Sequence, residues 1–152
     1  MSRFVLDASI ALAWFLDNPV AASASKAKQA LLRGSRAVVP ALWLLEITNG
    51  FVVAERRALI TEAQADAGLD ELNRLLAQGV DISNETISPS RLLSLARAFR
   101  LSAYDAVYLE TAQREQLALA TLDQSLRAAA IRGPDVSPGH DLGRSPRPRI
   151  DP

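Results

Sequence analysis

Four acidic side chains in this sequence have neighbours that suit chemistry better than solvation. Asp7 and Asp123 each follow a short run typical of a buried strand, whereas Glu46 and Asp105 lie among apolar residues early in segments of helical period. Burying an ionised carboxylate without a partner costs several kcal/mol, so such a group needs a cation, hydrogen bonds or a route to solvent. Few basic residues stand near these positions, and the four acids are therefore candidate ligands of a bound cation.

Magnesium is the cation that best suits such a set. Two carboxylates about 4 Å apart repel by ~4 kcal/mol at an effective dielectric constant of about 20, so four together would protonate or separate without a divalent ion. Mg²⁺ prefers oxygen ligands and keeps several waters, and Mn²⁺ should substitute for it. We expect Asp7 and Asp105 to be the chief ligands, with Glu46 and Asp123 holding waters of the ion or accepting a proton.

Taken singly, most of these acids also have a structural explanation. Asp7 and Asp123 precede predicted helices, where aspartate is a favourable N-cap worth ~1 kcal/mol. Asp105 stands three residues after Ser102, which is the spacing of a capping box. Glu46 lies inside an apolar helical segment with Asn49 on the same face, so a purely structural role explains it least well.

The elements that position these acids alternate along the chain between short β-branched runs and longer segments of helical period. This alternation predicts an α/β fold with a parallel sheet covered by helices. Ligands of such sheets bind outside the carboxyl ends of the strands, so Asp7 and Asp123 can lie close together. Strands are expected at 3–7, 37–39, 80–82 and 117–121, and helices at 9–15, 21–33, 42–57, 61–77, 89–99, 102–115 and 125–130.

Length and composition predict one folded domain over residues 1–132. A chain of 152 residues with 49% hydrophobic residues has enough apolar material for one full core. Residues 133–152 hold five of the eight prolines and three of the seven glycines and are interpreted as a tail, in which Val136 could add a short edge strand. No apolar run approaches the ~20 residues of a membrane span, and the N-terminus makes a poor signal peptide, so a cytoplasmic location is expected.

Several kinds of chemistry are excluded by what the chain lacks. There is no cysteine, and the one histidine, His140, lies in the predicted tail, which argues against serine–histidine triads and zinc sites. Seventeen basic residues balance seventeen acidic ones, so any grip on nucleic acid must be local. The candidates for such a local grip, each of which could equally belong to a solvated helix face, are Arg91, Arg97, Arg100, Arg114 and Arg127.

Four segments together give the chain a family likeness. It resembles the PIN-domain nucleases, and particularly the VapC-type toxins of bacterial toxin–antitoxin pairs, in VLDAS at 5–9, EITN at 46–49, LSAYDAVY at 101–108 and ATLD at 120–123. The resemblance covers about residues 1–132. It implies a three-layer α/β/α sandwich with four or five parallel strands, and magnesium-dependent RNA cleavage that leaves a 5′-phosphate and a 3′-hydroxyl. The catalytic, metal-binding positions it implies are Asp7, Glu46, Asp105 and Asp123, with Ser9 and Thr121 as weaker candidates for positioning a ligand or water.

The same resemblance implies partners. A toxin of this kind would have a VapB-type antitoxin that lays a segment across the site, and it would usually form a homodimer. The apolar segments 11–15 and 51–53 could supply such contacts, although ordinary core is the preferred interpretation for most of their side chains.

Other classes fit the sequence less well. A receiver domain needs a lysine late in the chain, a dehalogenase-type phosphatase needs an acid where Ser9 stands, and a dinucleotide-binding domain needs a glycine-rich first turn. Two alternatives stay open: a PIN nuclease that processes RNA without an antitoxin, and a non-catalytic α/β binding module.

Overall fold

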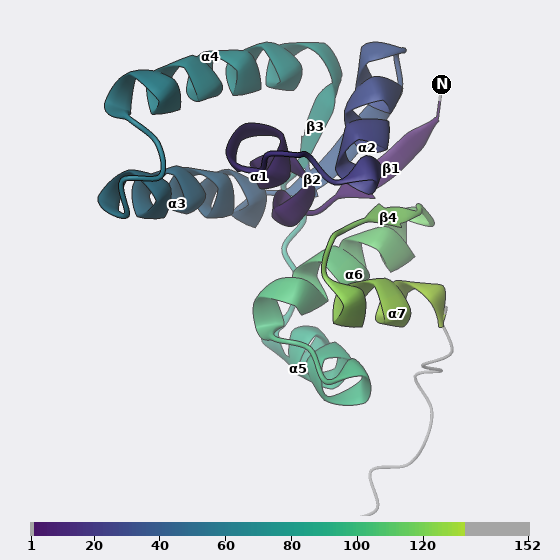
Figure 1. Ribbon diagram of the computed structural model, residues 1–152. Coiled ribbons are helices and arrows are strands. Elements are labelled where there is room, and N and C mark those ends of the chain that lie inside the picture. Colours follow the sequence, from purple (N-terminus) through teal and green to yellow (C-terminus); the bar gives the residue numbers. More distant parts are fainter. Residues whose placement is uncertain (1, 133–152) are drawn as a thin grey trace, which may run out of the picture.

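A single parallel sheet forms the centre of the molecule, and the computed structural model describes residues 2–132 of the chain. The strands lie in the order β3-β2-β1-β4, and every neighbouring pair is parallel (Figure 1). Their bounds are β1 Arg3–Leu6, β2 Arg36–Pro40, β3 Val80–Ser83 and β4 Leu119–Ala120.

Helices cover both faces of this sheet. Four of them lie on one face and three on the other, so the described chain has three layers (Figure 1). The first group is α1 Ala8–Leu16, α2 Ala22–Leu32, α3 Leu42–Arg56 and α4 Glu62–Gly79, and the second is α5 Pro89–Phe99, α6 Ala103–Glu115 and α7 Gln124–Ile131. The predicted fold class is therefore confirmed, with four strands in the described residues. The predicted tail and the edge strand at Val136 lie outside those residues.

The core explains why the two central strands carry almost no polar side chains. Val5 and Leu6 of β1 and Val39 of β2 are fully buried because helices cover both faces of these strands. Trp43 of α3 is equally buried, and Leu109 of α6 is 1% exposed. No helix in residues 2–132 is long and apolar enough to cross a membrane.

Strand β4 is shorter than the five residues predicted from the sequence. It lies at the edge of the sheet and pairs with β1 only at Leu119 and Ala120. The N–H of Leu117 instead donates to the carbonyl of Ala112 at 2.9 Å and closes the end of α6, where Gln116 adopts a left-handed conformation with φ 55°. The end of α6 thus uses the residues that would have extended the strand.

The order of the strands reverses between β1 and β4. The chain runs from β1 to β2 to β3 through helices on one face, and then returns through α5 and α6 on the other face to place β4 on the far side of β1. This reversal creates a crevice at the carboxyl ends of two neighbouring strands, which is where open α/β sheets bind ligands. Asp7 follows β1 directly and Asp123 follows β4 after two residues.

Candidate metal centre

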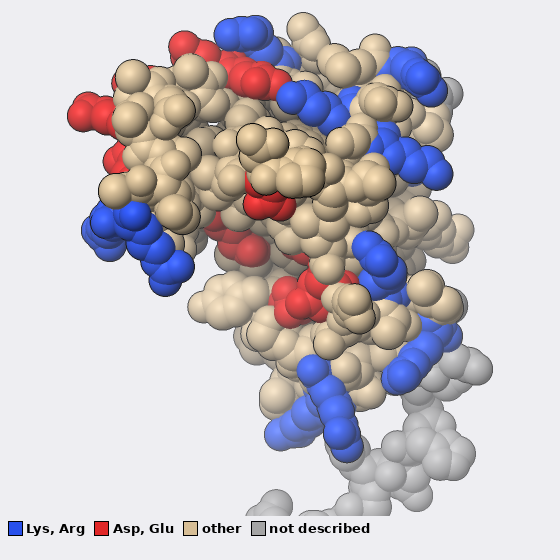
Figure 2. Space-filling view, viewed as in Figure 1, with Lys and Arg blue, Asp and Glu red and all other residues tan. Residues whose placement is uncertain are grey.

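All four predicted acids line one open cavity at this reversal point. The cavity measures about 550 Å³. Figure 2 shows acidic side chains gathered in the hollow between the two helical layers, with basic side chains to either side of it. Its acids come from four separate segments: Asp7 before α1, Glu46 in α3, Asp105 in the first turn of α6 and Asp123 before α7.

Asp7 is held by two hydroxyl groups. It is only 5% exposed, and its Oδ2 accepts hydrogen bonds from Ser9 Oγ and Thr121 Oγ1, each at 2.7 Å. Although Asp7 precedes α1, its side chain accepts no capping hydrogen bond from that helix. The N-cap explanation therefore fails for Asp7, and its carboxylate is fixed with one oxygen engaged by side chains.

The same two hydroxyls join distant parts of the chain. Ser9 Oγ accepts from the N–H of Leu122 at 3.0 Å, and Thr121 Oγ1 accepts from the N–H of Asp123 at 3.0 Å. Asp123 Oδ1 in turn accepts from the N–H of Leu126 at 2.8 Å, so this acid does cap its helix. Ser9 and Thr121, predicted to position a ligand or water, are thus observed to hold Asp7 and to connect it to the turn that carries Asp123.

Glu46 is paired with a tyrosine that sequence reasoning had given no role. The hydroxyl of the fully buried Tyr108 donates to Glu46 Oε1 at 3.0 Å. Burial raises the pKa of Glu46, the hydrogen bond from Tyr108 opposes this rise, and the charges of Asp7 and Asp105 add to it. Burial also raises the pKa of Tyr108, as does the negative charge of Glu46, so the phenol stays a hydrogen-bond donor.

Asp105 lies in the first turn of α6 and lines the same cavity as the other three acids. Its N–H donates to Ser102 Oγ at 3.1 Å, which is half of the predicted capping box. Burial raises the pKa of Asp105, a side-chain interaction with Ser102 opposes this rise, and the charges of Asp123 and Asp7 add to it. The four carboxylates therefore act on one another electrostatically, as members of one site.

A family model and a solved structure are similar to this chain. Residues 4–132 match the family model of the PIN domain. The chain belongs to the PIN-domain family. This is a family of magnesium-dependent nucleases. The PIN domain described here is also similar to the crystal structure of PAE2754 from Pyrobaculum aerophilum, with a TM-score of 0.64 and 20% identity over 89% of this chain and 90% of that chain, a likeness that shows the fold alone. No curated protein matches the chain.

The donor set of this PIN domain fits the metal that the family implies. Within the described part of the chain, no three His, Cys, Asp or Glu side chains form a ready-made group of metal ligands. Mg²⁺ does not need one, because it binds through one or two carboxylates and keeps the rest of its shell as water. The four acids of the cavity offer carboxylate oxygens, which are the ligands that Mg²⁺ prefers. A divalent cation bound among these carboxylates would relieve their mutual repulsion.

The cavity wall also contains residues that the sequence did not single out. Arg57, just after α3, lines it, whereas none of the five arginines predicted for its rim does so within residues 2–132. Gly50 lies in the same wall, and a Cβ there would come within 2.4 Å of Leu12 Cδ2, so glycine lets α1 and α3 approach closely at this point. Helical spacing could have signalled both Gly50 and Tyr108, since Gly50 lies four residues after Glu46 and Tyr108 lies three residues after Asp105.

Some of the arginines predicted to contact RNA, and some residues of the two apolar segments, make contacts within the folded domain. Arg114 forms ion pairs with Glu110 and Glu115, and Arg127 donates to the carbonyl of Thr121 at 2.7 Å. In the apolar segments 11–15 and 51–53, Ala11, Ala13 and Phe51 are buried in the core. The core interpretation therefore holds for these three side chains.

Proposed function

We propose that this PIN domain is a magnesium-dependent endoribonuclease and the VapC-type toxin of a type II toxin–antitoxin pair, acting on RNA in the cytoplasm. The observation that carries the proposal is the gathering of four carboxylates on one cavity at the β1/β4 reversal, where none of them pairs with a lysine or arginine of residues 2–132. Perturbed acids of this kind in an open cavity are typical of a functional site. The four motifs shared with VapC-type toxins support the toxin assignment.

In this proposal the acids divide their roles by position. Asp7, held by two hydroxyls, and Asp105 would bind Mg²⁺ or Mn²⁺ directly, while Glu46 and Asp123 would act through water. When bound, the ion neutralises charge on the scissile phosphate and lowers the pKa of water for hydrolysis. Glu46 suits the role of proton acceptor, because a carboxylate with a raised pKa is a better base near neutral pH.

Neighbouring side chains would prepare these acids and receive the RNA. Ser9 and Thr121 fix the orientation of Asp7, and Tyr108 fixes that of Glu46. Arg57 in the cavity wall would offset the repulsion between the carboxylates and an incoming phosphate.

An antitoxin segment and a second copy of the chain are the proposed protein partners. Leu45 and Tyr104, which adjoin Glu46 and Asp105 in sequence, are 69% and 64% exposed and offer apolar area to an antitoxin. Light scattering at micromolar concentration tests the homodimer, and a monomeric result would reject it.

Growth and cleavage assays test the function together. Three proteins are expressed in bacteria: the parent chain, Asp7→Asn and the control Asp70→Asn, which changes an exposed aspartate of α4. The purified proteins are then incubated with single-stranded RNA in Mg²⁺ or in a chelator. We expect growth arrest and Mg²⁺-dependent cleavage with the parent and Asp70→Asn only. Cleavage without arrest would favour an RNA-processing enzyme, whereas equal cleavage by Asp7→Asn would overturn the proposed site.

A further inference from the structure

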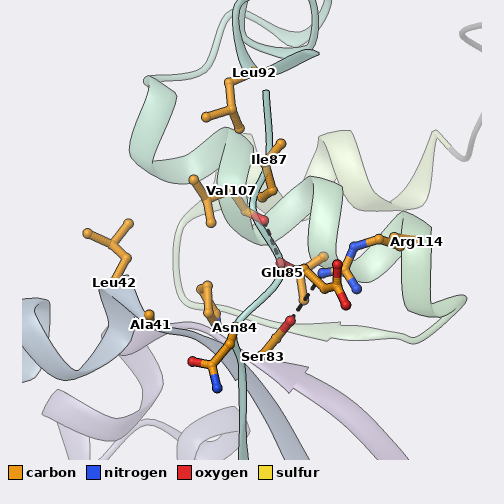
Figure 3. A pocket seen from close by; sticks show the side chains of 11 residues that line it. Ala41, Leu42, Ser83, Asn84, Glu85, Ile87, Leu92, Val107 and Arg114 are labelled. Carbon is orange, nitrogen blue, oxygen red and sulfur yellow. Dashed lines mark hydrogen bonds between the residues drawn. The ribbon is translucent and has the colours of Figure 1, made fainter. Parts of the chain in front are cut away.

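A second hollow opens at the same edge of the sheet, beside the acidic cavity. This hollow, here called the side pocket, measures about 290 Å³ and lies beyond the carboxyl ends of β2 and β3. Figure 3 shows apolar side chains of Leu42, Leu92 and Val107 around it, from α3, α5 and α6. Asn84 and Glu85, from the segment after β3, project to opposite sides of that segment.

Two helices contribute to both hollows. Helix α3 gives Leu42 to the side pocket and Glu46 to the acidic cavity, and these positions lie four residues apart, about 6 Å along the axis. Helix α6 gives Val107 to the side pocket and Asp105 to the acidic cavity. The side pocket and the acidic cavity therefore neighbour one another along α3 and α6, with no lining residue in common.

The polar groups of the side pocket are engaged in different ways. Arg114 forms ion pairs with Glu110 and Glu115 and donates to Ser83 Oγ at 3.3 Å, so its charge is already balanced. Thr111 donates to the carbonyl of Val107 at 2.8 Å. The Asn84 amide, in contrast, makes no hydrogen bond within residues 2–132 and keeps a donor and an acceptor for a ligand.

We propose that the side pocket binds one unpaired base of the RNA strand whose phosphate lies at the acidic cavity, with Asn84 reading the edge of that base. This inference rests on the proposed function and adds a binding site for one base of the RNA substrate. Apolar walls accept the flat faces of a base, and an amide can bond its edge in a bidentate way. A phosphate fits less well, because the one guanidinium in the lining is already paired with two carboxylates.

The dimensions support a single base over a larger ligand. Pockets for drug-sized molecules measure roughly 300–1,000 Å³, so the side pocket lies just below that range. A base within a duplex is stacked and paired and cannot enter such a pocket. The pocket therefore selects a strand that is unpaired next to the point of cleavage.

A binding experiment separates this inference from catalysis. Asp7→Asn protein, which is expected not to cleave, is titrated with the ribodinucleotides ApA, CpC, GpG and UpU while backbone amide resonances are followed by NMR. We expect shifts at residues 83–87 and 107 and a preference of about fivefold or more for one dinucleotide, lost when Asn84→Ala is added. The matched control is Asn73→Ala, an exposed asparagine of α4, which should keep the preference.

A cleavage experiment completes the test. A randomised RNA is incubated with the parent or with one of three variants, and the new RNA ends are sequenced. The variants are Asn84→Ala, the control Asn73→Ala, and Ala41→Trp, which fills the mouth of the side pocket from an exposed position. Loss of one base preference near the cut with Asn84→Ala and Ala41→Trp supports the inference, and an unchanged preference overturns it. If the parent cuts nothing but the dinucleotide shifts persist, the nuclease proposal fails while the base pocket stands. If no dinucleotide shifts residues 83–87, the pocket proposal is wrong even for an active nuclease.

Discussion

The carboxylates of this PIN domain fall into two groups with opposite electrostatics. Along the β2–β3 side of the sheet, Asp81 accepts hydrogen bonds from Arg36, and this pairing lowers the pKa of Asp81. In the acidic cavity, Glu46 and Asp105 have raised pKa values, first through burial and then through neighbouring negative charges. Neither acid forms an ion pair with a lysine or arginine of residues 2–132, and Glu46 instead accepts a hydrogen bond from the phenol of Tyr108.

This difference distinguishes a group that stabilises the fold from one that serves a site. Ionisation of an acid that is paired with arginine stabilises the folded protein, whereas ionisation of several acids that face one another destabilises it. The fold retains the unfavourable group because Ser9, Thr121 and Tyr108 fix it in place. This arrangement supports the proposal that the cavity holds a divalent cation.

The largest expected effect comes from Asp105→Asn. Removing a proposed metal ligand should lower the cleavage rate about 100-fold or more, because a bound ion contributes several kcal/mol to stabilising the transition state. The same change should raise the thermal stability of the metal-free protein, since it removes one of the mutually repelling charges. Rates on labelled RNA and melting in EDTA measure both effects. Asp81→Asn, the control from the paired group, should cleave normally, and a cleaving but destabilised Asp105→Asn would make Asp105 only a structural residue.

A rise in pH should lower the stability of the metal-free protein, and Mg²⁺ should raise it. Because the pKa values of Glu46 and Asp105 are higher in the folded than in the unfolded chain, metal-free stability should fall as pH rises above about 4 and through their folded pKa values. Mg²⁺ should restore about 2.7 kcal/mol at 100 times its Kd, with a larger effect at pH 8 than at pH 5. Melting curves with Mg²⁺, Mn²⁺ or EDTA provide the measurement. Equal metal stabilisation of the parent and the double variant Glu46→Gln, Asp105→Asn would count against the site.

Tyr108→Phe tests the hydrogen bond that holds Glu46, and its effect should be smaller than that of removing an acid. It removes one hydrogen bond to a half-buried carboxylate, which should cost about 1–2 kcal/mol of unfolding free energy and reduce cleavage roughly tenfold. Since that bond lowers the pKa of Glu46, its loss should move the acidic limb of the pH–rate profile to higher pH. Tyr104→Phe, one turn earlier on α6 and exposed, is the control. A slower variant with an unmoved pH profile would show that Tyr108 acts only through packing.

The smallest effect is expected in the paired group. The lowered pKa of Asp81 means that its contribution to stability is present above its unfolded pKa and disappears as pH falls through its folded pKa, below about 4. Asp81→Asn should therefore be slightly less stable than the parent at pH 7, the difference should shrink as pH falls below about 4, and 1 M salt should reduce it. Thermal melting of both proteins over a range of pH measures this, and a difference that does not shrink as pH falls below about 4 would indicate lost packing.

The sequence by itself determined the elements and the type of chemistry. Apolar runs such as Phe4-Val5-Leu6 and the helical spacing around Glu46 are local patterns, and local patterns report which face of a segment is buried. Acids at positions where burial is costly indicated a cation site before any contact was seen.

Only the tertiary structure decided which groups meet. The order β3-β2-β1-β4 brings Thr121 to Asp7 and Tyr108 to Glu46, and it places Arg57 in the cavity wall in place of the arginines that the sequence suggested. Likewise, the close of α6 at Leu117 shortened β4, and the meeting of three helices formed the side pocket. These outcomes depend on packing between segments far apart in the chain, and no periodicity within a single segment carries that information.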